Sequence, residues 1–438
     1  MAGVAGRWTR THGLALGAAA VAGLALRLFY LPDPGFSDDL GEFARLTAAI
    51  VENGLGRAYD ARMSFGPVVA YLWWIFSLVE PAFQGALDSS ALGVRLLLKT
   101  PPFVADVGLV AIMVVALRAR PTWAVIGAAV VLLHPVIWFV SAWWGQYESV
   151  YVFFALLAFV LAIRDRPLLG AIALTIAMLT KPQALALGLP FAAWYLARYD
   201  LRTVIRSGMT AVVTAIALWL PFLPFDGPTK YVDLLAYYHD DRFDVLSMRA
   251  WNVWWIVQRN ILHVPWVPDQ DPLIGPITYR MAGYAITVAL GSLVAYRVWR
   301  RPTPAVLALA LAASTLIAFT FLTTMHDRYS YAALVFLALL LDRRILLAFA
   351  ALLGALIMWN LLASASASTL LHWRWELSGN SGLIGSLGFI VSTLVSVALV
   401  WRQPADEKGA LEASAELDAP ETAGSESDPT PGTVAAPA

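Results

Sequence analysis

The stretch PAVLALALAASTLIAFTFLTTMHDRYSYAALVFLALLLDRR, residues 304–344, contains two apolar runs on either side of a short polar motif. The first run is close to the roughly 20 residues that an α-helix needs to cross the hydrocarbon core of a bilayer. The motif between the runs includes His326-Asp327-Arg328, and the second run ends at the basic pair Arg343-Arg344. This pattern predicts two membrane helices joined at a charged corner.

The composition of the whole chain agrees with this prediction. Of the 438 residues, 59% are hydrophobic and 14% are charged, whereas soluble domains carry about 25% charged residues. The net charge is zero, so bulk electrostatics give no reason to expect a nucleic-acid partner. The absence of cysteine excludes disulfides, thiolate metal sites and cysteine nucleophiles. We therefore predict an all-α integral membrane protein.

About twelve membrane crossings account for the apolar runs. They lie near residues 13–31, 100–117, 122–141, 149–163, 167–180, 183–198, 203–222, 278–298, 303–323, 328–341, 344–362 and 383–401. One class of connection is short and Arg-rich, as at 118–120, 164–166, 198–206, 297–301 and 343–344. The other class includes the long loops 32–99, 223–277 and 363–382. The positive-inside rule puts the Arg-rich turns in the cytoplasm, so we expect a multi-pass plasma-membrane protein with both termini cytoplasmic.

Three further segments need an interpretation. Residues 13–31 follow Arg7 and Arg10 like a signal peptide, but the run is longer than a signal-peptide core, which favours an uncleaved helix. Residues 67–79 are apolar but short for a span, so we predict a helix lying along the extracytoplasmic membrane face. Residues 403–438 are rich in Ala, Glu, Pro, Ser and Thr, which predicts a disordered acidic cytoplasmic tail after a membrane domain at 1–402.

The unusual polar residues gather on the predicted extracytoplasmic side, where functional groups of a membrane protein are expected. Asp38 and Asp39 begin an amphipathic segment in the first loop, which also contains Glu42. Acidic residues often start helices because they accept hydrogen bonds from free N–H groups, which is the structural alternative to a catalytic role. The later polar clusters on this side contain Trp144, Gln146, Lys181, Gln183, Arg242, Asn252, His326 and Arg328.

Together these side chains form a set suited to glycosyl transfer. A carboxylate can take the proton of an attacking hydroxyl, and basic groups can stabilise a leaving phosphate. Arginine forks onto phosphate oxygens while lysine offers a point charge. No Gly-rich phosphate loop is present, which disfavours a soluble nucleotide donor.

At these residues the chain resembles the GT-C class of membrane glycosyltransferases, and more loosely the dolichyl-phosphate-glucose glucosyltransferases. The likeness spans about residues 13–345. It is carried, in chain order, by Phe36–Glu42, His134-Pro135, Trp144-Gly145-Gln146, Leu179–Gln183, Trp251–Trp254 and Met325–Tyr329.

The resemblance implies a first loop with two surface-lying helices and a polyprenyl-phosphate-sugar donor. The sugar would be mannosyl, glucosyl or pentosyl, transferred with inversion to a glycan or glycolipid acceptor. An Asp of the first loop is the general base in this class, so Asp38 or Asp39 inherits that role, with Asp38 favoured by alignment. Lys181, His326 and Arg328 would face the donor phosphate. Glu42, Trp144, Gln146, Gln183, Arg242 and Asn252 would line the pocket.

The match departs from the eukaryotic glucosyltransferases at one point. They carry an acidic residue before a Tyr-Pro-Pro segment, where this chain has Ser64-Phe65-Gly66-Pro67. Either Asp38 or Asp39 supplies the base, or Asp60 substitutes for it. Asp38, Asp39 and Glu42 could together hold a divalent ion, but we expect no metal or other cofactor.

Two other functions compete with a monosaccharide transferase. A transporter or flippase of a lipid-linked or charged solute would place polar residues near helix centres, whereas here the ionisable residues crowd at one face, with Arg27 and Asp106 among the few inside apolar segments. A polymerase or ligase that moves a preassembled glycan shares the chemistry of the transferase, and product size would separate the two.

Overall fold

The computed structural model describes residues 6–79, 90–237, 244–365, 379–403 and 409–417. Within them the chain is mostly helical, and all twelve segments predicted to cross the membrane are helical. Seven helices are long and apolar enough to span a bilayer: α1 (Arg10–Tyr30), α4 (Leu92–Ala116), α10 (Leu201–Trp219) continued by η5 (Leu220–Phe225), α13 (Tyr279–Arg300), α14 (Pro304–Phe321), α16 (Arg344–Ser364) and α17 (Gly379–Arg402).

Two further helices, which together are long and apolar enough for an eighth span, are separated by a bend at a proline. Helix α5 (Pro121–Leu133) is followed at a 43° bend by α6 (Pro135–Trp138) and η3 (Phe139–Trp144). Pro135 lacks the N–H of a helical ladder and disfavours a helical conformation at the residue before it. His134 is accordingly extended, and its Nδ1 accepts a hydrogen bond from the backbone N–H of Val136.

The remaining predicted spans are shorter than a full crossing. They are α7 (Glu148–Ile163), α8 (Pro167–Met178), α9 (Gly188–Arg198) preceded by η4 (Pro182–Leu187), and α15 (Tyr331–Leu337) continued by η8 (Ala338–Leu340). Their positions agree with the sequence, whereas the number of twelve crossings stays a prediction because helix length alone does not decide it.

Burial separates the central helix from those that face lipid. In α14, 83% of the span is buried, against 6% in the span that begins with α10. A helix that is apolar on every side is expected at the centre of a bundle, and α14 packs against α9, α13, α15 and α17. The strongly apolar, exposed surface of α10 is suited to lipid.

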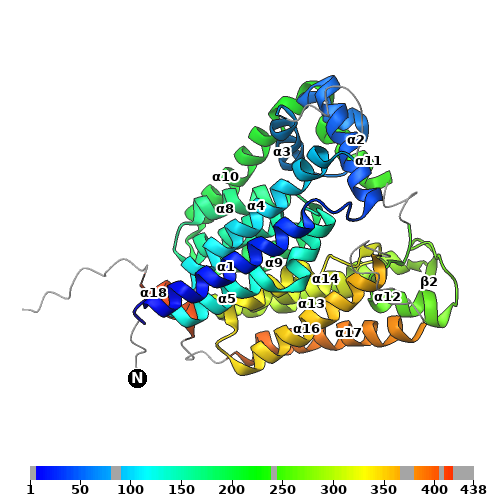
Figure 1. The fold of residues 1–438 in the computed structure, drawn as a ribbon. Helices are drawn as coiled ribbons and strands as arrows, with labels where there is room; N and C mark the ends of the chain where they lie inside the picture. The colour runs from blue at the N-terminus through cyan, green and yellow to red at the C-terminus, as the bar shows by residue number, and fades with distance from the viewer. Residues whose placement is uncertain (1–5, 80–89, 238–243, 366–378, 404–408, 418–438) are drawn as a thin grey trace, which may run out of the picture.

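The first predicted loop contains the expected non-spanning helices. They are α2 (Ser37–Asn53), η1 (Leu55–Ala61) and α3 (Pro67–Ser77). Helix α2 buries Leu40, Phe43 and Leu46 as its amphipathic pattern predicts, and α3 has 11 residues, about 16 Å, too few to cross a membrane. These helices pack together with η5 and α11 (Gly227–Tyr237). Figure 1 shows α2, α3 and α11 gathered at one end of the bundle, which we call the site end.

The second long loop adds short elements at the site end. These are β1 (Ser247–Met248), α12 (Val253–Trp255), η7 (Ile256–Ile261), β2 (Pro272–Ile274) and β3 (Ile277–Thr278). Strand β1 pairs in parallel with β4 (Met325–His326), so the loop is joined directly to the polar motif after α14.

Part of the tail is ordered against the opposite end. Helix α18 (Ala410–Glu416) buries Ala410 and Leu411, and Ser414 accepts a hydrogen bond from the backbone N–H of Ala119. Glu412 accepts another from the backbone N–H of Ala305 at the start of α14. This short helix supplies partners for exposed N–H groups, and the disorder of residues 403–438 as a whole stays a prediction. The domain boundary at residue 402 stays a prediction.

Candidate active site

Asp39 lies where the first loop meets the turn between η3 and α7. Its Oδ2 accepts hydrogen bonds from Trp144 Nε1 at 2.8 Å and from Gln146 Nε2 at 2.5 Å. The turn can approach so closely because Gly145 adopts φ +81°, and a Cβ at this position would lie 2.9 Å from Lys99 Cγ. The carboxylate is half-buried and held at one oxygen, an arrangement that fixes its direction.

The other carboxylates proposed as a base have different surroundings. Asp38 is exposed beside Ser37. Glu42 is exposed and forms an ion pair with Arg45 at 2.6 Å. Asp60 pairs with Lys230 and Arg57, and the hydrogen bond from Lys230 lowers the pKa of Asp60. Asp39, by contrast, forms an ion pair with Arg328, one of the basic residues described next.

Two cations face Asp39 across a buried glutamate. Lys181 Nζ lies 2.7 Å from Glu148 Oε1, and Arg328 Nε lies 3.4 Å from the same oxygen. Arg328 also reaches Asp39 Oδ2 at 3.9 Å and Asp327 Oδ1 at 3.6 Å. We call Asp39, Glu148, Lys181, Asp327 and Arg328 the charged cluster.

Aromatic rings and an amide complete the cluster. The Arg328 guanidinium lies 5.1 Å from the centroid of the Trp144 ring, within the range of a cation–π contact. Lys181 Nζ donates to Gln146 Oε1 at 3.3 Å, so one amide joins Lys181 to Asp39. Gln183 hydrogen-bonds to Tyr329 next to Arg328. The structure therefore brings together Asp39, Trp144, Gln146, Lys181, Gln183 and Arg328, all singled out in the sequence.

Backbone contacts deliver the two cations to this place. The N–H groups of Gly66 and Val68 at the start of α3 donate to the carbonyls of Thr180 and Leu179, which fixes the chain immediately before Lys181. Arg328 follows β4, whose partner β1 belongs to the second long loop. Thr324, just before β4, has φ +61°, which turns the chain sharply between α14 and the motif.

A buried polar network lies directly behind the cluster. Asp106 accepts from Arg27 at 2.8 Å, from Ser141 at 2.6 Å and from Ser149 at 2.5 Å. Ser149 also hydrogen-bonds to Tyr331 at 2.8 Å. Ser149 directly follows Glu148, and Tyr331 is three residues after Arg328. The network therefore anchors the segments that carry Glu148 and Arg328. Arg27 in the last turn of α1 and Asp106 inside α4 are thus paired, as buried charges must be.

Burial and charge shift the pKa values of the site in opposite directions. Burial lowers the pKa of Lys181, and the carboxylate of Glu148 opposes that shift. Burial also acts to lower the pKa of Arg328, but Asp39 and Glu148 raise it above its ordinary value. Burial raises the pKa of Asp327 to about 6. Burial and the nearby Arg328 lower the pKa of His326 well below its usual value, so its imidazole is neutral at pH 7.

Two residues that the sequence predicted to line the substrate pocket are not part of this group. Asn252 is fully buried, donates to the carbonyls of Phe319 and Leu322, and accepts from the N–H of Trp255. The side-chain amide of Asn252 is therefore occupied by hydrogen bonds to the backbone. Arg242 lies outside the described residues.

Sequence reasoning did not single out Glu148 as a site residue. The signal was an acidic residue directly after Trp144-Gly145-Gln146-Tyr147 at the start of an apolar run. Glu148 is fully buried, and its Oε2 has no hydrogen-bond partner among the described residues. Within the same part of the chain, no three His, Cys, Asp or Glu side chains are grouped as metal ligands would be.

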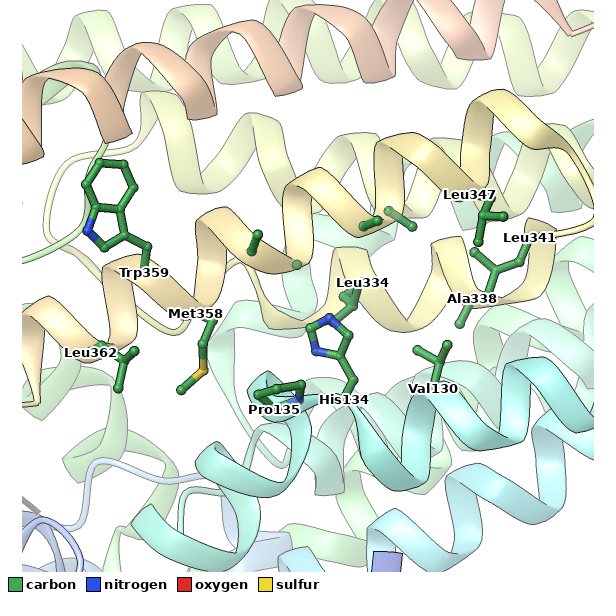
Figure 2. Close-up of a pocket in the computed structure, with 14 residues that line it drawn as sticks. Val130, His134, Pro135, Leu334, Ala338, Leu341, Leu347, Met358, Trp359 and Leu362 are labelled. Carbon is green, nitrogen blue, oxygen red and sulfur yellow. The ribbon is translucent and has the colours of Figure 1, made fainter. Parts of the chain in front are cut away.

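An apolar pocket of about 660 Å³ lies between α5, α6, α15 and α16. Figure 2 shows its lining, with Leu341 and Leu347 toward one end, His134 in the middle, and Trp359 and Leu362 toward the other. At the end with Trp359 and Leu362, the side chain of Asn360 donates a hydrogen bond to the backbone carbonyl of Arg249. Arg249 in turn forms an antiparallel backbone β-bridge with His326. The pocket therefore ends close to the elements that carry the charged cluster.

The fold and the cluster define a multi-pass membrane protein with a polar site at one end of its helical bundle. The glycosyltransferase family 87 model matches residues 65–324, so the chain belongs to glycosyltransferase family 87. This confirms the expectation of a membrane glycosyltransferase and argues against the transport alternative.

Among solved structures, the chain is similar to the archaeal oligosaccharyltransferase AglB from Archaeoglobus fulgidus in complex with an inhibitory peptide and a dolichol-phosphate. The identity is 14% and the TM-score is 0.44, over 89% of this chain and 56% of that one. The chain thus spans little more than half the length of AglB. No curated protein matches at a significant level.

Proposed function

We propose that this glycosyltransferase moves a hexosyl or pentosyl residue from a polyprenyl-phosphate-sugar donor to a glycan or glycolipid acceptor, with inversion and with Asp39 as general base. The observation that carries the proposal is the placement of Asp39 within 4 Å of Arg328, in a cluster that also contains Lys181. A base and phosphate-binding cations must both lie next to the reacting anomeric carbon.

The reaction follows from these positions. The acceptor hydroxyl oxygen attacks the anomeric carbon from the face opposite the phosphate, and its proton passes to the Asp39 carboxylate. The bond between the anomeric carbon and the phosphate oxygen breaks, and that oxygen keeps the electron pair. Arg328 and Lys181 stabilise the departing polyprenyl phosphate, with neutral His326 as a hydrogen-bonding neighbour.

A lipid-linked donor is supported by the apolar pocket. Its lining is almost entirely apolar, and it leads along α16 toward Arg249 and His326. A hydrocarbon chain gains about 25 cal/mol for each Å² that it buries in such surroundings. Because the pocket ends near the elements that carry the cations, a phosphate attached to a long prenyl chain suits both.

The distribution of arginine supports an extracytoplasmic site. Arg-rich turns follow α4, α7, α13 and η8, at the ends of these helices away from the charged cluster. Under the positive-inside rule those turns are cytoplasmic. We therefore propose that the site end lies outside the plasma membrane and that both termini lie inside, in a protein of the cell envelope.

The test is sugar transfer by the purified protein in lipid, with radiolabelled polyprenyl-phosphate-mannose, -glucose and -arabinose as donors and native membrane extract as acceptor. Asp39→Asn should lower kcat by about 10²- to 10⁴-fold, the usual contribution of a general base, while the matched control Asp38→Asn should keep most activity. Full activity of Asp39→Asn would refute its role. Addition of EDTA should leave transfer unchanged, since we propose no metal.

A further inference from the structure

The β2–β3 hairpin presents an unusual surface for a loop outside the membrane helices. Its strands pair between Pro272 and Thr278 and between Ile274 and Ile277. Residues 272–277 read PLIGPI and include no polar side chain. Ile274 is 73% exposed, and Leu273 and Ile277 are exposed beside it. A water-facing hairpin normally alternates apolar and polar residues, so this surface is suited to something other than water.

The hairpin is continuous with the lipid-facing side of α13. Strand β3 leads directly into this helix, and both strands contact it. Met281, Tyr284 and Val288 lie on one exposed face of α13, at helical spacing after Ile277. With 22 residues, α13 is about 33 Å long, and Arg297 and Arg300 mark its other end. A hydrocarbon core of about 30 Å therefore places the hairpin at headgroup depth.

A second exposed aromatic fits the same depth. Trp266, on the segment that precedes the hairpin, is 43% exposed, and tryptophan and tyrosine favour the membrane–water interface. The exposed residues from Ile261 to Ile277 include one carboxylate, Asp271. The other carboxylate of this segment, Asp269, is fully buried in a bidentate pair with Arg280.

We propose that the β2–β3 hairpin, together with Trp266, inserts into the lipid leaflet at the site end and acts as an interfacial membrane anchor. Leu273, Ile274 and Ile277 would enter the boundary between headgroups and acyl chains. This inference does not depend on the proposed reaction.

The base of the anchor is linked to the candidate active site. Asp269 accepts a hydrogen bond from Thr323 at 2.6 Å as well as from Arg280. Thr323 is two residues before β4, which leads to Arg328. An anchor at this position would fix the height of the charged cluster relative to the lipid headgroups.

The chain contains no cysteine, so single labels can be introduced without background. Ile274→Cys, Met281→Cys and Asn53→Cys would each carry a nitroxide in the full protein, reconstituted in phosphatidylcholine–phosphatidylglycerol nanodiscs. Collision with oxygen, which concentrates in lipid, would be compared with collision with a water-soluble nickel chelate. Met281 is the lipid-facing control, and Asn53 is the exposed polar control at the end of α2.

The oxygen-to-nickel accessibility ratio at Ile274 should exceed that at Asn53 and approach that at Met281. A ratio equal to that at Asn53 would place the hairpin in water and overturn the proposal. Low collision rates with both reagents would also overturn it, because they would show that a second copy or another protein covers the hairpin. Unchanged thermal unfolding of the labelled variants would confirm that the fold is intact.

Discussion

Asp39 and Glu148 are carboxylates that both lie within 4 Å of the Arg328 guanidinium, and their surroundings give them different roles. Asp39 is half-buried at a helix start, with one oxygen held by Trp144 and Gln146, so it can meet an acceptor hydroxyl. Glu148 has no exposed surface and pairs through one oxygen with both cations. It therefore holds Lys181 and Arg328 in place and keeps them charged.

Glu148→Gln preserves the shape of this side chain and removes its charge. Because burial lowers the pKa of Lys181 and Glu148 opposes that shift, the substitution should lower the pKa of Lys181 further. The ammonium is then lost at a lower pH, so the alkaline limb of the kcat/KM profile for the donor should move to lower pH. Glu148→Asp, which keeps the charge, should restore part of the limb. A profile that does not move in Glu148→Gln would contradict this role.

The members of the charged cluster could be predicted from the sequence where the local pattern was unusual. Lys181 and Arg328 are charged residues between apolar runs, which is costly unless they are used, and the Asp38-Asp39 pair stood at a helix start. The choice between the two aspartates depends on which one faces the turn at Gly145. Sequence spacing does not reveal that contact, because it joins residues more than 100 positions apart.

At the scale of elements, one close approach connects α3 to the cation site. Gly66 lies against the backbone at Leu179, and a Cβ there would overlap the carbonyl oxygen of Leu179. The N–H of Gly66 donates to Thr180, the residue before Lys181. The short helix of the first loop therefore positions a cation that comes from a turn more than 100 residues later.

Gly66→Ala should separate these two segments. The added methyl group meets backbone rather than a flexible side chain, so we expect a loss of about 1 to 3 kcal/mol in the free energy of unfolding. The displacement of Lys181 should also raise the KM for the donor. Thermal unfolding and donor saturation curves would check both. Gly54→Ala is the control for a glycine in open space, although its φ of +81° adds backbone strain. A Gly66→Ala protein as stable as the wild type, with the same donor KM, would be inconsistent with this packing.

The element positions followed from the sequence because apolar length and Arg-rich turns are strong signals in a membrane protein. The short α3 was predicted to lie outside the span for the same reason. The break at His134-Pro135 and the docked helix α18 were not predicted. The break comes from Pro135 and a local hydrogen bond within an otherwise apolar run, whereas α18 depends on hydrogen bonds to distant residues, such as that from the Ala119 N–H to Ser414, which composition does not reveal.

At the scale of the whole molecule, one buried ion pair links the last turn of helix α1 to the bundle, in addition to the packing of α1 against α5. Only 11% of its span is buried, yet Arg27 is almost fully buried and donates to Asp106 and to the carbonyls of Val131 and Leu132. The pair thus joins α1 to α4 and α5, and through Ser149 and Tyr331 it reaches the helices that carry the charged cluster.

Removal of one partner should be worse than removal of both. Arg27→Met leaves a buried carboxylate and Asp106→Leu leaves a buried guanidinium, so each should cost about 3 to 5 kcal/mol of stability. The double variant should cost less than the sum of the two. Thermal unfolding of the purified proteins in detergent would measure this coupling. Strictly additive losses would mean that the two residues act independently.

The same pair has a consequence for how the chain is made. Arg27 enters the membrane with the first helix, and its partner Asp106 lies 79 residues later. At about 5 to 20 residues per second, synthesis of that stretch takes on the order of 4 to 16 s. During this interval the guanidinium, in the last turn of α1, lacks its counterion; an Arg at a helix centre is unfavourable by about 3 kcal/mol, and one nearer a helix end by less. We therefore expect α1 to stay beside the translocon until α4 emerges, and to pack into the bundle only once Asp106 is available as the counterion of Arg27.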